Sequence, residues 1–270
     1  MTNQDAEPPR VRDVATMRGK KFGRKGIYLL PNLLTTGSLF AGFYAIVAAI
    51  NGRYEPAVIS IFVALVLDGM DGRIARITNT QSDFGAEYDS LSDMVSFGLA
   101  PALVAYEWVL FDLGKIGWLC AFVFTSTAAL RLARFNAQAS VVDRKYFQGL
   151  PSPAAAAVVA GVIWFIESYG LKQNFAVVPV LFITTITMAL LMVSNIRYYS
   201  FKELDLRGRV PFIAVLAIVL VFVLVSLDPA AVLAICFVAY AISGPVITLM
   251  QIRERRAARR RDDSDRQDAA

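Results

Sequence analysis

Residues 67–93 read LDGMDGRIARITNTQSDFGAEYDSLSD, and this stretch places four aspartates directly beside a long apolar run. Residues three or four positions apart lie on one face of a helix. By this spacing, one face of a first helix carries Asp68, Asp71, Gly72, Ala75 and Arg76, and one face of a second carries Gly85, Asp89 and Asp93. We therefore predict two helices joined by a turn, packed antiparallel, with small residues that let the backbones approach and four carboxylates that converge.

Four converging carboxylates repel one another unless a positive charge lies among them. Carboxylate oxygens without Cys or His partners suit hard cations such as Mg²⁺ or Mn²⁺, and the chain contains no histidine. We therefore predict a site for divalent metal, with two ions. Hard ions held by few carboxylates complete their coordination with substrate phosphates, so the predicted substrate carries phosphate. The alternative is a solvated acidic helix end that Arg73 and Arg76 neutralise.

The spacing of the stretch, D-x2-D-G-x2-A-R-x8-G-x3-D-x3-D, resembles the signature of the CDP-alcohol phosphatidyltransferases without departure. The resemblance implies that a CDP-linked lipid and an alcohol react to give a phosphodiester lipid and CMP. It implies a six-helix core, usually dimeric, with the metals between the second and third helices. By the same resemblance, Asp68, Asp71 and Asp89 are metal ligands, Asp93 is both a metal ligand and the general base, and the CDP pocket is lined by Gly72, Ala75 and Arg76.

The composition indicates an all-α polytopic membrane protein. The 270 residues are 56% hydrophobic, with a mean hydropathy of +0.52. A helix that spans a bilayer needs about 20 apolar residues. Apolar runs near this length predict eight transmembrane helices, a six-helix core plus two additional C-terminal helices, at residues 29–50, 55–76, 92–111, 115–135, 153–170, 174–194, 210–227 and 229–250.

These runs divide the chain into four parts. We predict a basic cytoplasmic segment at 1–26, the catalytic membrane core at 27–200, and a loop with two transmembrane helices at 201–250. The charged residues 251–270 show no apolar periodicity and predict an unstructured cytoplasmic tail. After the predicted span at 174–194, Tyr198, Tyr199 and Phe201 predict an aromatic belt at the membrane interface.

The distribution of basic residues predicts the orientation in the cytoplasmic (inner) membrane. With eight spans and a cytoplasmic N-terminus, all of the 27 Lys and Arg residues except Arg53, Lys115 and Lys172 lie inside, as positive loops generally do. The carboxylates then lie at the cytoplasmic face. A re-entrant pair in place of the last two spans would overturn the even count. The net charge of +5 is spread between apolar spans, which favours membrane lipids over nucleic acid as partners.

The acceptor alcohol is predicted from segments outside the signature. Residues 29–46, 92–102, 131–136 and 147–156 resemble the bacterial and archaeal phosphatidylserine synthases, which implies CDP-diacylglycerol and L-serine as substrates. Arg131 and Arg134 share a helix face at the inner end of a span, and a guanidinium can bind a carboxylate such as that of serine through two hydrogen bonds. Another acceptor (glycerol 3-phosphate, inositol or choline), an ion-coupled transporter, or a non-catalytic membrane scaffold are the alternatives.

Overall fold

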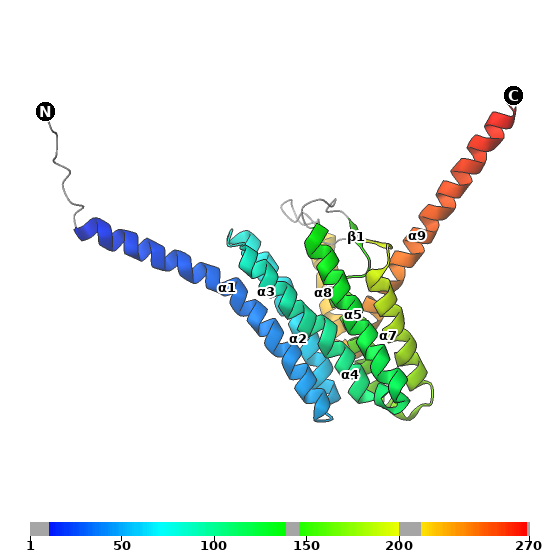
Figure 1. Ribbon diagram of the computed structural model, residues 1–270, viewed down its shortest axis with the longest axis horizontal. Helices are drawn as coiled ribbons and strands as arrows, with labels where there is room; N and C mark the ends of the chain where they lie inside the picture. The colour runs from blue at the N-terminus through cyan, green and yellow to red at the C-terminus, as the bar shows by residue number, and fades with distance from the viewer. Residues whose placement is uncertain (1–10, 139–145, 200–211, 269–270) are drawn as a thin grey trace.

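The computed structural model describes residues 11–138, 146–199 and 212–268, and this part of the chain is a helical bundle with one short two-stranded ribbon (Figure 1). Its first half comprises α1 (Val11–Ile50), α2 (Tyr54–Ile77), α3 (Asp83–Asp93), the π-helix η1 (Met94–Leu99), α4 (Ala100–Trp108), the 3-10 helix η2 (Leu110–Leu113) and α5 (Lys115–Gln138). Its second half comprises β1 (Tyr146–Gln148), α6 (Ser152–Ser168), the 3-10 helix η3 (Leu171–Gln173), α7 (Val177–Val193), β2 (Arg197–Tyr199), α8 (Phe212–Leu227) and α9 (Pro229–Asp268).

The helices confirm an all-α membrane fold. Three of them contain segments long and apolar enough to cross a membrane, at Leu30–Ile50, Lys115–Ala137 and Pro229–Met250. The apolar helices α6 and α7 are shorter. α2 is long enough to span, but the charged residues of the signature in its last turns keep it from being among these three segments. The count of eight spans therefore stays a prediction.

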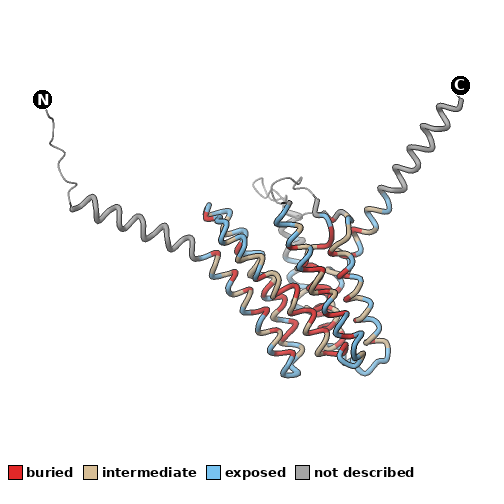
Figure 2. Tube along the Cα trace, viewed as in Figure 1, coloured by how far each residue is buried: buried red, intermediate tan, exposed pale blue. Residues whose placement is uncertain are grey.

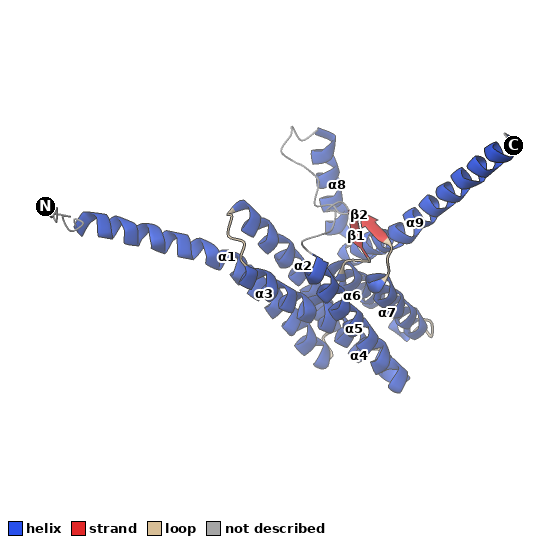
Figure 3. Ribbon diagram, turned by 45° about the horizontal axis from the view of Figure 1, so that its top comes forward, coloured by secondary structure: helices blue, strands red, loops and turns tan. Residues whose placement is uncertain are grey.

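The interior of the bundle is built mainly from small residues around α6. The buried residues gather on the inner sides of the helices (Figure 2). Most of α6 is buried, including the alanines at 154–157, and α6 packs against α2, α7 and α9. A Cβ atom added at Gly161 would lie 3.1 Å from the Cα atom of Ala234 in α9, so the two backbones nearly touch. Small residues allow such close approach between membrane helices. α9 is thus part of the packed bundle, whereas α8 packs chiefly on α9 and reaches away from the other helices (Figure 3).

Three predictions about local structure are wrong. Residues 251–268 are not unstructured, because α9 continues through them, and their Ala, Arg, Glu and Gln residues favour helix. The predicted span at 92–111 is not one regular helix, because it consists of the end of α3, the π-helix η1, α4 and the start of η2. Tyr198 is not in an interfacial belt, because its side chain is fully buried.

Different turns and connections lie at the two ends of the bundle. One end holds the α1–α2 turn and the connections from α4 to α5 and from α6 to α7, and the other holds the α2–α3 turn and the ribbon (Figure 1). At the first end the ammonium group of Lys172 lies 4.4 Å from the centre of the Tyr54 ring, so η3 and the start of α2 are adjacent. Arg53 precedes α2 directly, so these basic residues lie at the end of the bundle opposite the signature.

Candidate active site

The signature folds into a helix, a tight turn and a second helix, as its spacing predicts. Asn79 adopts a left-handed backbone (φ 51°), a conformation that asparagine tolerates better than most residues, and it reverses the chain after α2. Ser82 then caps α3, since its hydroxyl accepts a 3.1 Å hydrogen bond from the backbone N–H of Gly85. The serine cap therefore fixes where α3 begins and so which of its residues face α2.

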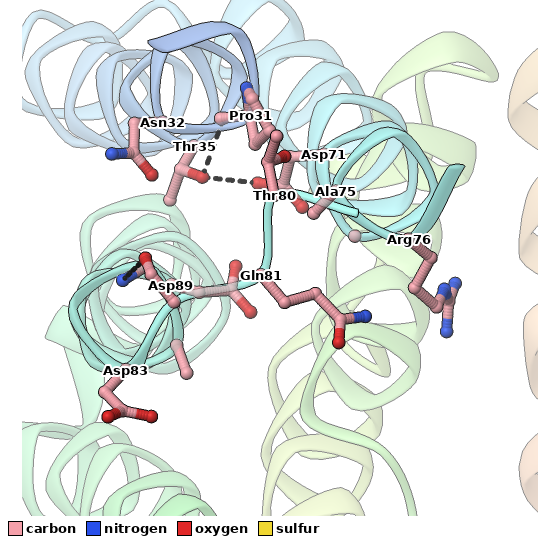
Figure 4. Close-up of a pocket in the computed structure, with 14 residues that line it drawn as sticks. Pro31, Asn32, Thr35, Asp71, Ala75, Arg76, Thr80, Gln81, Asp83 and Asp89 are labelled. Carbon is pink, nitrogen blue, oxygen red and sulfur yellow. Dashed lines mark hydrogen bonds between the residues drawn. The ribbon is translucent and has the colours of Figure 1, made fainter. Parts of the chain in front are cut away.

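The two halves of the signature do not pack closely on each other, and this corrects the predicted direct packing. α2 and α3 both pack against α1, and a cavity of about 460 Å³ lies between them (Figure 4). Pockets for small ligands commonly have volumes of roughly 300–1,000 Å³. α1 therefore acts as the common support, and the space that the prediction filled with helix–helix contact is open to a ligand.

Three of the four predicted metal ligands come together, and two of them, Asp71 and Asp89, line this cavity. Asp68, Asp71 and Asp89 each offer a carboxylate oxygen, and these oxygens lie within 4.8 Å of one another. Asp71 is only 4% exposed. Its Oδ2 accepts a 2.7 Å hydrogen bond from the hydroxyl of Thr35 in α1. The carboxylates thus converge from two helices on a small volume, as the sequence predicts.

Asp93 lies beside this group at the end of α3. It is near the carboxylates of Asp68 and Asp89 and near the guanidinium of Arg131. Its Oδ1 is buried without a hydrogen-bond partner among the described residues. Carboxylates held this close in a low-dielectric site need a proton or a cation between them. All the donor atoms are oxygens, so the set suits a divalent cation such as Mg²⁺ or Mn²⁺.

The segment that follows Asp93 is fastened to α1. Ser92 donates its hydroxyl hydrogen to the carbonyl of Thr35 at 3.2 Å, and Ser96 donates to the carbonyl of Ser38 at 3.0 Å. A Cβ atom at Gly42 would lie 2.5 Å from the Ser96 hydroxyl oxygen, so only glycine lets η1 approach α1 this closely. π-helical turns often occur at functional sites. Here the π-helix directly follows Asp93 and belongs to the segment that these hydrogen bonds hold against α1.

The alternative of a solvated, self-neutralised acidic helix end does not match the side-chain contacts. Both Arg73 and Arg76 are exposed, and among the described residues neither forms an ion pair with an aspartate. Figure 4 shows the Arg76 side chain at the edge of the cavity, pointing away from the aspartates.

The residues predicted for CDP binding line the cavity. Gly72, Ala75 and Arg76 all belong to its wall. A Cβ atom added at Gly72 would meet nothing within 4 Å, so the glycine leaves empty space on the cavity side of α2. A larger side chain would occupy room that a ligand needs. Gly72 therefore borders the cavity and is not at the helix–helix contact that the sequence suggested.

The two arginines predicted for the acceptor lie in different surroundings. Arg131 lies beside Asp93, and its Nη1 donates a 2.9 Å hydrogen bond to the hydroxyl of Ser152 at the start of α6. Arg134 lies one turn further along α5, where its Nη2 donates to the amide oxygens of Gln148 at 2.7 Å and Asn195 at 2.8 Å. Arg131 thus faces the carboxylates as predicted, whereas Arg134 belongs to a polar cluster with the ribbon.

Sequence reasoning assigned no role to Thr35, Gln148 or Ser152. The sequence does contain a pattern that indicates Thr35. Pro31, Asn32 and Thr35 interrupt an apolar run on one helix face. Polar residues within membrane helices usually serve a function. Gln148 ends the short strand β1, which follows residues 139–145 outside the described part of the chain, and no pattern marks it.

The chain is similar to a set of named enzymes. A family model described as CDP-alcohol phosphatidyltransferase matches residues 28–194, more than half of the chain. A Helicobacter pylori protein named CDP-diacylglycerol–serine O-phosphatidyltransferase is 40% identical over 198 residues, which cover 73% of this chain and 83% of the relative. Relatives of the same name are 37% identical over 175 residues in Bacillus subtilis (64% of this chain, 92% of the relative) and 38% identical over 184 residues in Methanocaldococcus jannaschii (68% and 80%).

Proposed function

The chain belongs to the CDP-alcohol phosphatidyltransferase family, and from this membership we propose that it transfers the phosphatidyl group of CDP-diacylglycerol to L-serine, giving phosphatidylserine and CMP. The observation that carries the proposal is the position of Asp93 and Arg131 beside the carboxylate cluster. A proton acceptor and a cationic group thereby lie beside a cluster from which Asp71 and Asp89 line a cavity of about 460 Å³.

The carboxylate cluster supports a divalent-metal site. Asp68, Asp71 and Asp89 would hold the cation, Mg²⁺ or Mn²⁺, and Asp93 would share in binding a second ion. When bound, the metal supplies positive charge that neutralises the pyrophosphate and stabilises the leaving CMP. The cytidine end of the substrate would occupy the cavity along Gly72, Ala75 and Arg76, where α2 leaves open space.

Asp93 is the proposed general base. In the transfer, the serine hydroxyl oxygen forms a bond to the phosphatidyl phosphorus, the bond from that phosphorus to CMP breaks, and the hydroxyl proton moves to the Asp93 carboxylate. The buried Oδ1 of Asp93 has no hydrogen-bond partner among the described residues, so a lone pair is available to accept this proton.

Arg131 and Arg134 are proposed to recognise the serine carboxylate. Arg131 donates a hydrogen bond from Nη1 to the hydroxyl of Ser152. Arg134 donates hydrogen bonds from Nη2 to the amide oxygens of Gln148 and Asn195. These hydrogen-bond partners carry no charge, so they orient the guanidinium groups without neutralising them, although the carboxylate of Asp93 also lies near Arg131. A carboxylate is the natural charged partner for such a pair. Choline offers no carboxylate, and inositol offers only hydroxyls.

The remaining predictions about organisation are also proposals. We place the protein in the cytoplasmic membrane with the carboxylates at the cytoplasmic face, which is supported by the location of Arg53 and Lys172 at the opposite end of the bundle. The family resemblance implies a homodimer. We also propose the division of the chain into four parts, at residues 1–26, 27–200, 201–250 and 251–270.

The acceptor assignment is tested by the kinetics of arginine variants. In purified protein supplied with CDP-diacylglycerol and Mn²⁺, Arg131→Ala and Arg134→Ala should each raise the KM for serine and change the KM for CDP-diacylglycerol much less. If both variants keep the serine KM of the unmodified protein, the carboxylate assignment is wrong. A family member with another acceptor, such as glycerol 3-phosphate, is then the better candidate.

A further inference from the structure

The short ribbon connects one of the two arginines to the C-terminal helix. β1 and β2 pair antiparallel, with Phe147 opposite Tyr198 and Gln148 opposite Arg197. The turn after β1 is tied to the same ribbon, since Gly149 donates its backbone N–H to the carbonyl of Ile196 at 2.8 Å. Gln148 in β1, together with Asn195 just before β2, accepts the hydrogen bonds of Arg134. The position of the ribbon therefore sets the position of the Arg134 guanidinium.

α9 holds the ribbon through Tyr198. The Tyr198 side chain is fully buried, and its hydroxyl donates a 3.0 Å hydrogen bond to the backbone carbonyl of Ala241. Its ring lies on Gly244, where a Cβ atom would come within 2.3 Å of the ring carbons. Burial and the neighbouring Tyr240 raise the pKa of Tyr198 to about 12, so its hydroxyl keeps its proton at every ordinary assay pH.

The same face of α9 also approaches the other arginine. Tyr240 packs on Tyr198, with 5.7 Å between ring centres, and lies near enough to Arg131 for the two groups to interact electrostatically. Arg131 in turn bonds to Ser152 at the start of α6, the helix on which α9 packs. One stretch of α9, residues 240–244, thus supports the surroundings of both arginines.

We propose that residues 240–244 of α9 form the supporting wall of the acceptor pocket, and that Tyr198 is a positioning residue that acts on Arg134 through Gln148 and Asn195. α9 lies beyond residues 28–194, the region that the family model matches, so this support is a feature of the chain outside the shared region. The inference rests on the proposed function only in assigning the two arginines to the acceptor.

The test compares two variants of the support with a matched control. Tyr198→Phe keeps the ring and removes one hydroxyl, and Gly244→Ala pushes the ring away from α9. Tyr169→Phe is the control, because the Tyr169 hydroxyl also anchors α9 through one hydrogen bond, a 2.6 Å bond to Asp228 just before the helix begins. Asp228 directly precedes α9, whereas Tyr198 of the ribbon packs against Ala241 and Gly244, further along the helix.

We measure the KM for serine and the KM for CDP-diacylglycerol separately, together with thermal unfolding in detergent. Loss of one hydrogen bond predicts a roughly threefold to tenfold higher serine KM for Tyr198→Phe. The KM for CDP-diacylglycerol should stay unchanged, and Tyr169→Phe should leave both KM values unchanged. Gly244→Ala should act in the same direction as Tyr198→Phe. If Gly244→Ala does not fold, Tyr198→Phe alone decides the outcome.

The proposal is overturned if Tyr198→Phe changes both KM values equally, or lowers the unfolding temperature while the serine KM stays unchanged. The Arg134→Ala variant distinguishes failure of the proposed role of α9 from failure of the acceptor assignment. If Arg134→Ala raises the serine KM and Tyr198→Phe does not, the role of α9 fails and the acceptor assignment stands. If Arg134→Ala and Arg131→Ala both leave the serine KM unchanged, the acceptor assignment itself fails.

Discussion

Thr35 in α1 donates a 2.7 Å hydrogen bond from its hydroxyl to Oδ2 of Asp71 in α2. The bond fixes a buried carboxylate of the cluster from a helix that carries none of the cluster's four aspartates. The carbonyl of Pro31, at 3.1 Å, is the other acceptor within reach of the same hydroxyl. Groups that orient metal-binding carboxylates from behind commonly affect metal affinity by about 10- to 100-fold. α1 is therefore part of the site as well as its support.

Thr35→Val should weaken divalent-metal binding by roughly tenfold or more, because Asp71 loses its orienting donor. Thr35→Ser keeps a hydroxyl and should retain most of the affinity. The measurement is the unfolding temperature during a Mn²⁺ titration without substrates. Thr125→Val is the control, since among the described residues the Thr125 hydroxyl bonds to backbone carbonyls alone, at 3.0 Å to Ala121 and 3.4 Å to Gly98. Equal Mn²⁺ affinity in all variants would contradict a role for Thr35.

Asp93→Asn should keep CDP-diacylglycerol binding and lose turnover by about 100-fold or more, because an amide cannot accept the serine proton. Asp68→Asn and Asp89→Asn should instead weaken metal and nucleotide binding together. Binding of a CDP-lipid analogue and CMP release are measured on the same preparations. Asp112→Asn, at an exposed position of η2, serves as the control. Near-full activity in Asp93→Asn would mean that another group is the base.

Gly72→Ala should raise the KM for CDP-diacylglycerol without loss of stability. The added methyl group points into open space on the cavity side, and alanine favours helix over glycine by up to about 1 kcal/mol. Gly69→Ala is the matched control, since Gly69 also has no neighbour within 4 Å but does not line the cavity. Steady-state kinetics and thermal unfolding of both variants decide the question. A change of KM that is the same in both would refute a specific role for Gly72.

The aspartate cluster could be predicted from the sequence because it depends on the spacing of residues that lie close together in the chain. The helical spacing of Asp68, Asp71 and Asp89 fixes their faces, and Ser82 marks where α3 begins. The bundle as a class could be read as well, because apolar runs of membrane length leave few alternatives to helix.

The residues that support the site from distant parts of the sequence could not be predicted in the same way. Thr35 reaches Asp71 across 36 positions of sequence, and Tyr198 reaches Ala241 across 43. Both contacts depend on which helices pack together, which periodicity does not specify. Tyr198 resembles an interfacial tyrosine in sequence, and only the packing of the ribbon on Gly244 shows that it is buried.

The end of the bundle opposite the site should affect stability but not catalysis. Glu167 there accepts a hydrogen bond from the Trp108 indole N–H and lies 3.7 Å from the ammonium group of Lys172. Glu167→Gln should therefore destabilise the protein by about 1 kcal/mol, because the hydrogen bond weakens and the ion pair is lost. The unfolding temperature should fall while both KM values stay constant. A selective rise of the serine KM would show that the two ends are coupled.

The central claim is that serine is the acceptor at the aspartate cluster, and acceptor-dependent CMP release tests it most directly. Purified protein in detergent receives CDP-diacylglycerol and Mn²⁺, with L-serine, glycerol 3-phosphate, inositol or choline in separate reactions, and the lipid product is identified. The account predicts CMP and phosphatidylserine with serine alone, and loss of both in Asp93→Asn. CMP release with a different acceptor, or with serine at full rate in Asp93→Asn, would contradict it.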